Sequence, residues 1–213
     1  MEETTSREKI LKNIRNALIS KLENPFQNID FESSVYPEFE ESLDITFAQE
    51  FTKAGGKFIY CENHTDFVRQ LAVLINESSW SSIFCKEPQI QSLLTQAGIP
   101  FKSEEAEIKN TNAGLTSCEF LISRRGSILV SSAKGSGRKI HFFPETHLVL
   151  AYSSQLVPEI KNAFEEMKKV YDISPSMMTM ITGPSRTADI EKTLVMGAHG
   201  PKDVYLFLID DEE

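Results

Sequence analysis

Residues 44 to 102 alternate between segments with helical periodicity and short apolar runs, and this alternation constrains the fold most strongly. Strands that are joined through helices by short turns run parallel, because each helix carries the chain back to the same end of the sheet. The sequence therefore predicts an α/β fold, with an open, mostly parallel sheet covered by helices on both faces. We expect helices that end at Ala54 and cover 66–76 and 88–97, and strands at 57–61, 82–85 and 99–102.

The middle of the chain predicts antiparallel pairing. Two apolar runs, 119–123 and 127–132, are separated only by Arg124-Arg125-Gly126. Three turn residues cannot join parallel strands, so these runs indicate a hairpin. We therefore expect a mixed sheet. Further strands are expected at 139–143 and 147–152, and a helix from Pro158 to Val170.

The last thirty or so residues predict a strand, a helix and a final strand. Thr187 or Ser185 can cap a helix N-terminus, and Ile190 and Leu194 lie four residues apart on one helical face. Gly197 supplies the permissive backbone that ends many helices. A buried strand is expected after Pro201, so the unit has the length of a strand–helix–strand crossover.

The 213 residues contain no internal linker, so we expect one domain, 44–213, preceded by an N-terminal extension, 1–43. Within the extension, 6–18 has apolar residues at helical spacing. Residues 24–43 contain aromatic side chains without any period and indicate an extended arm. The arm packs either on its own domain or on a neighbouring subunit, so a homo-oligomer is one of two open expectations.

Composition argues against several classes of function. The net charge is −9 and basic residues are not clustered, so neither nucleic acid nor an anionic membrane is expected as a partner. No apolar run has the eighteen or so residues of a membrane span, and the N-terminus does not resemble a secretory signal, so we expect a cytoplasmic protein. Cys61, Cys85 and Cys118 are too scattered for an iron–sulfur or zinc site and are expected to be buried and inert. The four histidines have no metal-binding spacing, so we predict neither a metal nor a cofactor.

The turn from Gly183 to Thr187 is the first candidate binding site. Backbone N–H groups at a helix start, the hydroxyls of Ser185 and Thr187, and the guanidinium of Arg186 suit a phosphate or carboxylate. Asp189 follows closely and disfavours a highly charged phosphate. A helix cap beside a solvated arginine gives the same sequence, so that structural interpretation stays open.

The loop Gly135-Ser136-Gly137-Arg138 is the second candidate. It is flanked by Lys134 and Lys139, so it could close over an anionic ligand with Gly135 and Arg138 in contact. It lacks the glycine patterns of known phosphate-binding loops, and a plain hairpin turn is the alternative.

Glu119 and His199 are the candidate catalytic groups. Glu119 opens an apolar strand, so it is either exposed at the sheet rim or buried with a raised pKa, and the buried form would suit a base or nucleophile. His199 lies in a glycine-rich turn, where an imidazole can transfer protons. His147, at the start of a buried strand, is a weaker candidate, with a simple hydrogen bond at the strand end as the alternative.

A set of glycine, proline and polar residues between Thr116 and Asp210 resembles the LUD domain of LutC/YkgG-like lactate-utilization proteins. The matching residues are Thr116, Glu119, Gly126, Pro144, His147, Gly183, Pro184, Ser185, Thr187, Asp189, Glu191, Gly197, His199, Gly200 and Pro201. The resemblance implies a fold like that of the NagB/RpiA/CoA-transferase group. This chain has Arg124-Arg125 where many members have an acid and a threonine, which puts any chemistry resting on that acid in doubt.

Two functions follow as expectations. The resemblance implies a component of a cytoplasmic L-lactate utilization system that oxidises lactate to pyruvate together with separate iron–sulfur proteins. The alternative is a small-molecule enzyme like the CoA transferases, sugar-phosphate isomerases and 5-formyltetrahydrofolate cyclo-ligase. In that case Glu119 would be the nucleophile or base, and Arg186 with the Gly183 turn would hold an anionic substrate.

The expected helix also fixes an expected site. A helix of about ten residues would hold the Gly183 and Gly197 turns roughly 15 Å apart. We therefore expect a ligand site at the Gly183–Asp189 end, joined by Glu119 and the Gly135–Arg138 loop, with His199 in a separate or subunit-facing role.

Overall fold

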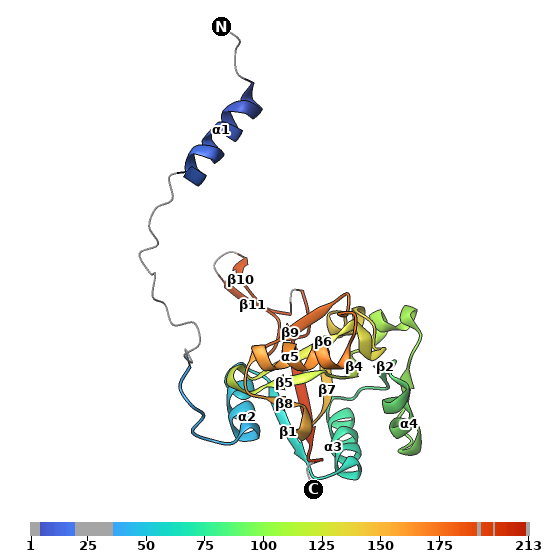
Figure 1. Cartoon of the computed structure of the whole chain (residues 1–213). Coiled ribbons are helices and arrows are strands. Elements are labelled where there is room, and N and C mark those ends of the chain that lie inside the picture. The colour runs from blue at the N-terminus through green and yellow to red at the C-terminus, as the bar shows by residue number, and fades with distance from the viewer. Residues whose placement is uncertain (1–4, 20–35, 191–192, 198, 212–213) are drawn as a thin grey trace. The chain divides into compact units, whose positions relative to one another are not determined.

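The computed structural model describes residues 5–19, 36–190, 193–197 and 199–211 (Figure 1). The chain divides into two compact units, Met1–Glu38 and Phe39–Glu213. The first contains the helix α1, Ser6–Ile19, in which no side chain is buried. Thr5 and Glu8 cap its start, because the Thr5 N–H donates to the Glu8 carboxylate at 2.8 Å. This division falls after Glu38, and the domain boundary expected at residue 43 stays a prediction.

The larger unit is built around a main sheet of six parallel strands. Their order is β1-β12-β7-β4-β2-β3. Leu148, in the centre, is in register with Leu115 on one side and Tyr205 on the other. The expected α/β fold is therefore confirmed. The strands are β1 Lys57–Cys61, β2 Ile83–Cys85, β3 Phe101–Lys102, β4 Ala113–Ser117, β7 Thr146–Tyr152 and β12 Asp203–Ile209.

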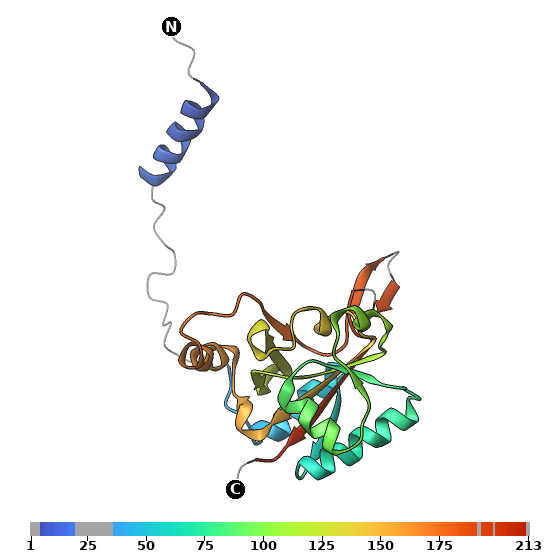
Figure 2. The ribbon, with the colours of Figure 1, turned by 90° about the vertical axis from the view of Figure 1, so that its right-hand side faces the viewer.

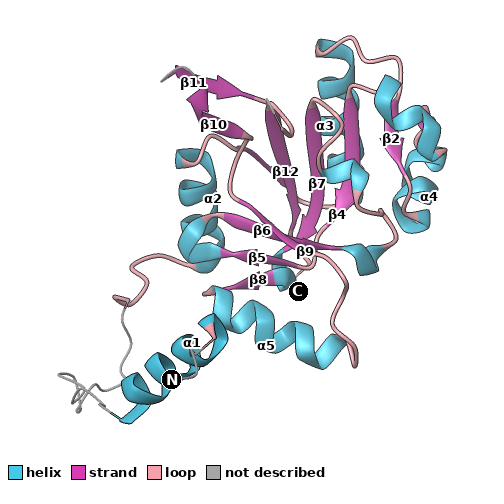
Figure 3. Cartoon of the chain, turned by 90° about the horizontal axis from the view of Figure 1, so that it is seen from above, coloured by secondary structure: helices cyan, strands magenta, loops and turns pink. Residues whose placement is uncertain are grey.

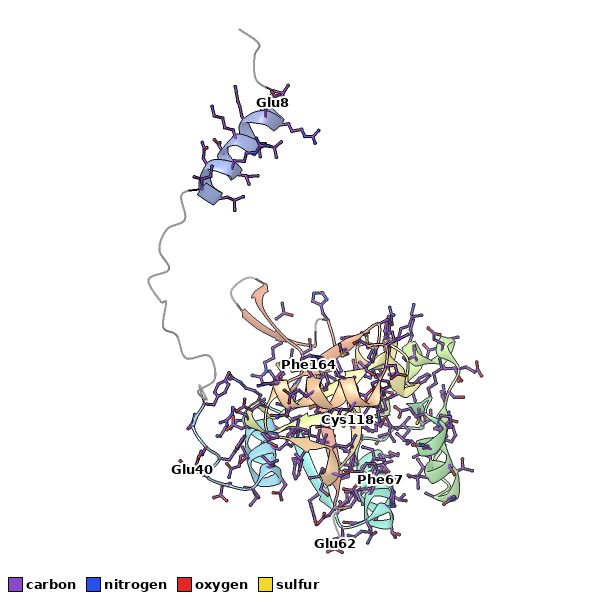
Figure 4. All side chains as sticks on the ribbon, viewed as in Figure 1. Glu8, Glu40, Glu62, Phe67, Cys118 and Phe164 are labelled. Atoms are coloured by element: carbon purple, nitrogen blue, oxygen red, sulfur yellow. The ribbon has the colours of Figure 1, made fainter. Side chains whose placement is uncertain are left out.

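Two helices, α3 (His64–Glu77) and α4 (Pro88–Gln96), cover one face of the main sheet (Figure 2). Asn63 caps α3 by accepting the Asp66 N–H at 3.0 Å. The ring of Phe67, labelled in Figure 4, meets the edge of Phe207 on β12 with centroids 5.2 Å apart. Alternation along β12 sends Phe207 to this face and Leu206 to the other, so both faces of the sheet are buried.

A second sheet of four strands, in the order β8-β5-β6-β9, packs on the other face of the main sheet together with α2, Leu43–Lys53 (Figure 3). The expected hairpin is confirmed, since β5 and β6 pair antiparallel with Leu121 opposite Ile128. The mixed pairing therefore lies in this second sheet. Its outer face is covered by α5, Ile160–Val170, through Ala163 and Met167. The strands are β5 Phe120–Ile122, β6 Ser127–Ser131, β8 Leu156–Val157 and β9 Met178–Ile181.

Gly126 fixes the hairpin against α2. It ends a short 3₁₀ turn, η2 (Ser123–Arg125), with φ of 54°, and a Cβ at this position would lie 2.1 Å from the backbone nitrogen of Phe51. Only glycine fits this close approach of two backbones.

Two of the expected elements are wrong. The helix expected after Thr187 is a hairpin of β10, Arg186–Ile190, and β11, Thr193–Met196, in antiparallel pairing. The strand expected at 139–143 is instead a 3₁₀ turn, η4 (Lys139–His141). The other short turns are η1 Glu105–Asn110, η3 Ser132–Lys134 and η5 Ser153–Gln155. In the described part of the chain, no helix has the length and apolar character needed to cross a membrane.

Candidate functional site

The parallel main sheet has two chemically different edges. At its carboxyl edge, where the strands end, Glu87 follows β2 and Glu119 lies two residues after β4. At its amino edge, Gly56, Glu145 and Lys202 precede β1, β7 and β12. The seven-residue strand β7 spans roughly 20 Å, so groups at opposite edges cannot contact one small ligand.

Glu119 is buried at the carboxyl edge and is held by three side chains. The hydroxyl of Ser131 donates to its carboxylate at 2.5 Å, and the hydroxyl of Tyr171 donates at 3.0 Å. The ammonium of Lys134 lies 3.7 Å away. Of the two arrangements left open by the sequence, exposure at the rim is wrong: Glu119 is only 4% exposed, immediately before β5 and beside Ser131 and Tyr171.

Tyr171 remains a hydrogen-bond donor at neutral pH. Burial, and then its hydrogen bond to Glu119, raise the pKa of the phenol to about 12. Gln155 holds the backbone around Glu119, since its side-chain amide donates to the carbonyls of Cys118 and Glu119 at 2.8 and 3.0 Å. Glu119 is therefore placed in a rigid setting, which suits a reactive carboxylate and equally a structural ion pair.

Glu87 is a second buried carboxylate that the sequence reasoning missed. It accepts the backbone N–H of Ser117 at 2.9 Å and the Ser117 hydroxyl at 2.5 Å. Burial raises its pKa, and the charge of Lys134 opposes that shift. An acid between an expected strand and the proline that opens a helix lies at the carboxyl edge by topology, and that position was the available signal.

The three cysteines are buried, as expected. Burial raises the pKa of the Cys61 thiol to about 11 and that of Cys85 to about 12, and it raises the pKa of Cys118 further. Cys118, labelled in Figure 4, is therefore a neutral thiol at physiological pH and not a nucleophile. Within the described ranges, no group of three or more histidine, cysteine or acidic side chains could hold a metal ion.

The second candidate loop lies near Glu119. Lys134, which contacts Glu119, immediately precedes Gly135. The residues from Ser136 to Ile140 then line a pocket of about 230 Å³ together with Phe84 and Lys86, which belong to the end of β2. The structure thus brings Glu119 and the Gly135–Arg138 loop to the same edge. Arg138 donates to the hydroxyl of Ser176 at 2.6 Å.

The Gly183–Thr187 turn lies at the opposite, amino edge. Gly183 has φ of 75°, and a Cβ there would lie 2.3 Å from the carbonyl oxygen of Ala54, just before β1. A terminal nitrogen of the Arg186 guanidinium lies 2.9 Å from the place that a Cβ would take at Gly55, in the turn between α2 and β1. The single site that the sequence predicts, with Gly183 and Arg186 joined to Glu119, therefore does not form, because the length of the sheet separates the two groups.

The turns around Gly183 and Gly197 are in contact. Ser185 N–H donates to the carbonyl of Pro201 at 2.8 Å, and Gly197 N–H donates to the carbonyl of Ser185 at 2.9 Å. The separation of roughly 15 Å expected from a helix is therefore wrong. Ser185 and Thr187 therefore lie at the amino edge, close to the contact between the two turns. The side chains of Asp189 and Glu191 fall outside the described residues. His199 is exposed at the same edge and lines a hollow with Phe142, Phe143 and Lys202. Its catalytic role stays a prediction.

His147 and His141 form a buried pair on the β7 face that meets the second sheet. Nε2 of His147 lies 2.9 Å from the hydroxyl of Thr116, and the two imidazole rings are 5.3 Å apart. Burial lowers the pKa of His147 to about 3 and that of His141 to about 4, although the Gly137 backbone opposes part of the His141 shift. Both rings are neutral at pH 7. His147 is therefore better interpreted as a hydrogen-bonded side chain at the strand end than as a group that transfers protons.

Comparison with known proteins adds a family match in the second half of the chain. The model of the LUD domain matches residues 96–209, more than half of the 213 residues. "Lactate utilization protein C" of Geobacillus sp. (strain WCH70) is 36% identical over 107 residues, which are 48% of this chain and 44% of that protein. The protein of the same name from Bacillus subtilis (strain 168) is 32% identical over 115 residues, 52% of this chain and 48% of that protein.

The chain thus spans less than half the length of these curated relatives. Among solved structures, a DUF162 family protein from Deinococcus radiodurans aligns with a TM-score of 0.61 and 16% identity. The alignment covers 81% of this chain and 99% of that one. At this identity the likeness supports the fold alone.

Proposed function

Because the chain belongs to the LUD domain family, we propose that it is a component of a cytoplasmic L-lactate utilization system and works with separate iron–sulfur proteins. The observation that carries the proposal is the 36% identity, over 107 residues, to a protein named for lactate utilization. Cys61 and Cys85 are buried in the core between the main sheet and α3 and α4, and Cys118 is buried in the core on the other face of the sheet. This arrangement supports a division of labour in which the partners carry the redox centres.

A deletion strain with a tagged copy of the gene tests this role. We expect slower growth of the deletion strain on L-lactate and normal growth on glucose, with growth on lactate restored by the tagged copy. Purification of the tagged protein from lactate-grown cells should yield iron-containing partner proteins. Normal growth of the deletion strain on L-lactate, together with a purified protein free of iron-containing partners, would contradict the proposal.

Glu119 favours a second candidate function, a small-molecule enzyme acting at the carboxyl edge. Its carboxylate is buried and immobilised, with Lys134 close enough to stabilise its charge. Such a group can act as a base or nucleophile toward a bound substrate. The Arg186 guanidinium lies at the other edge, so the anionic end of a substrate would be held on the Glu119 side.

A thermal-shift screen distinguishes this second function from a purely structural role. Lactate, pyruvate, CoA esters, folates and sugar phosphates are tested at roughly millimolar concentration, where weak ligands still stabilise the fold by mass action. The enzyme proposal expects turnover of a stabilising compound that is lost in Glu119→Gln and retained in Lys168→Gln, an exposed change on α5. The absence of any stabilising compound would contradict it.

A further inference from the structure

The pocket of about 230 Å³ next to the Glu119 cluster has one apolar wall. Phe84, Ile108 and Ile140 pack together there as a small cluster separate from the three larger cores. Phe84 faces the pocket because its neighbours in β2, Ile83 and Cys85, face α3 and α4. Since a water occupies about 30 Å³ in the liquid, this volume corresponds to roughly seven or eight waters. The pocket is large enough for a ligand of about ten non-hydrogen atoms.

The opposite wall is a loop built to accept negative charge. Gly137 has φ of 79°, and Arg138 follows it in the right-handed region with φ of −98° and ψ of −34°. Alternation of left- and right-handed residues turns successive N–H groups toward one side, which is the geometry of anion-binding loops. Among the described residues, the amides of Ser136, Gly137 and Arg138 donate no hydrogen bond to the protein.

Ser136 gives an independent indication that the pocket binds a ligand. Ser136 is one of the residues that line the pocket, is only 4% exposed, and has a hydroxyl without a hydrogen-bond partner in the described structure. A buried hydroxyl left unpaired costs roughly 1–3 kcal/mol, so such groups generally have a partner. A carboxylate oxygen bound at this loop would accept the Ser136 proton.

The charges at the pocket mouth favour an anion as well. Lys86, Arg138 and Lys139 surround it and Glu105 is the one acid among the lining residues, which leaves a net charge of +2. Lys139 is paired with Glu105 at 2.6 Å, so Lys86 and Arg138 are the cations that remain for a ligand. Both are exposed, so their attraction is screened by water, and the apolar wall has to contribute the rest of the affinity.

We propose that this pocket binds a small organic carboxylate. The carboxylate lies against Ser136 and the Gly137–Arg138 amides, and an apolar body contacts Phe84, Ile108 and Ile140. Mostly apolar pockets with a few convergent polar groups are the usual form of small-molecule sites. The proposal does not depend on the role in lactate utilization. The apolar wall indicates a ligand with a larger apolar part than that of lactate.

Amide chemical shifts of the ¹⁵N-labelled full chain test the site with benzoate as the probe. We expect binding with a Kd of roughly 1 mM, as suits about nine non-hydrogen atoms, and shift changes centred on 84–86 and 136–140. Benzamide has the same shape without the charge, and L-lactate has the charge with little apolar body. Both are expected to bind at least about tenfold more weakly.

Variants separate this site from general surface binding. Arg138→Gln is expected to weaken benzoate binding about three- to tenfold, whereas Lys168→Gln, the matched exposed change on α5, leaves it unchanged. Ser136→Ala should weaken binding without lowering the unfolding midpoint, because it removes an unpaired buried hydroxyl. No benzoate binding up to about 20 mM, equal binding of benzamide, tighter binding of L-lactate, or shift changes centred away from the loop would overturn the proposal. The result of the lactate growth test would be unaffected.

Discussion

His141 and His147 illustrate how burial sets protonation in this protein. Their folded-state pKa values of about 4 and about 3 lie well below the usual value of 6.5, and burial is the main cause for each. In the unfolded chain both rings gain a proton as the pH falls through about 6.5, whereas the folded rings stay neutral until pH 4 or below. Acid therefore favours the unfolded state, and the stabilising effect of neutral rings is present above pH 6.5.

The free energy of unfolding should consequently fall between pH 7 and pH 5. Each histidine is expected to contribute a loss of about 2 kcal/mol at pH 5, since a tenfold difference in proton affinity corresponds to about 1.4 kcal/mol. Urea titrations at several pH values check this. His147→Gln should roughly halve the loss, whatever its effect at pH 7, and an unchanged pH dependence would show that His147 is not a neutral buried ring. Burial raises the pKa of Glu87, so this residue makes the free energy of unfolding rise as the pH falls. It does so equally in the wild-type protein and in His147→Gln.

The sequence identified Glu119 but not its surroundings. Its position at the start of an apolar strand leaves rim exposure and burial open, and the structure places it buried at the carboxyl edge of the main sheet. Its burial depends on Ser131 and Tyr171, which are 12 and 52 residues away along the chain. Contacts at such separations depend on how the second sheet and α5 pack, and periodicity within short windows does not encode that packing.

At the scale of elements, patterns with one dominant signal gave correct predictions. The helix at 66–76 has its apolar residues on a single face, and α3 forms there as His64–Glu77. The hairpin around Gly126 follows from loop length alone. The segment after Thr187 carried two conflicting signals, a cap with an i, i+4 apolar pair and a set of β-branched residues. The β-branched preference agrees with the observed strands β10 and β11.

Gly126→Ala tests the packing of the β5–β6 hairpin on α2. The added Cβ would overlap the Phe51 backbone at 2.1 Å, in addition to the cost of a left-handed alanine. We expect the free energy of unfolding to fall by at least about 2 kcal/mol more than in Gly98→Ala. Gly98 is a matched control, with φ of 66° and open space around its Cβ position. If chemical denaturation gave equal losses of unfolding free energy for Gly126→Ala and Gly98→Ala, α2 would not pack closely against this turn.

At the scale of the whole molecule, the buried core clusters of the described residues all lie in the unit Phe39–Glu213, whereas α1 buries no side chain. Removal of residues 1–19 should therefore leave the midpoint of urea unfolding of the larger unit nearly unchanged, because α1 contributes no buried side chain. A clear drop in the midpoint at equal protein concentration would show that the extension stabilises the domain, either within one chain or between subunits. Homo-oligomerisation stays a prediction.

The fold separates two groups of residues that the sequence joined into one site. Glu119, Glu87 and the Gly135–Arg138 loop lie at the carboxyl edge, and the Gly183 and Gly197 turns lie at the amino edge. Open α/β sheets bind ligands at the carboxyl ends of their strands. We therefore propose that the function resides at the carboxyl edge.

Growth on L-lactate of the deletion strain carrying single variants tests that assignment most directly. Glu119→Gln is expected to fail to restore growth at normal protein levels, because the buried carboxylate is replaced by a neutral amide. Arg186→Gln, at the amino edge, is expected to restore it. Restored growth with Glu119→Gln, or failure with Arg186→Gln alone, would contradict the account.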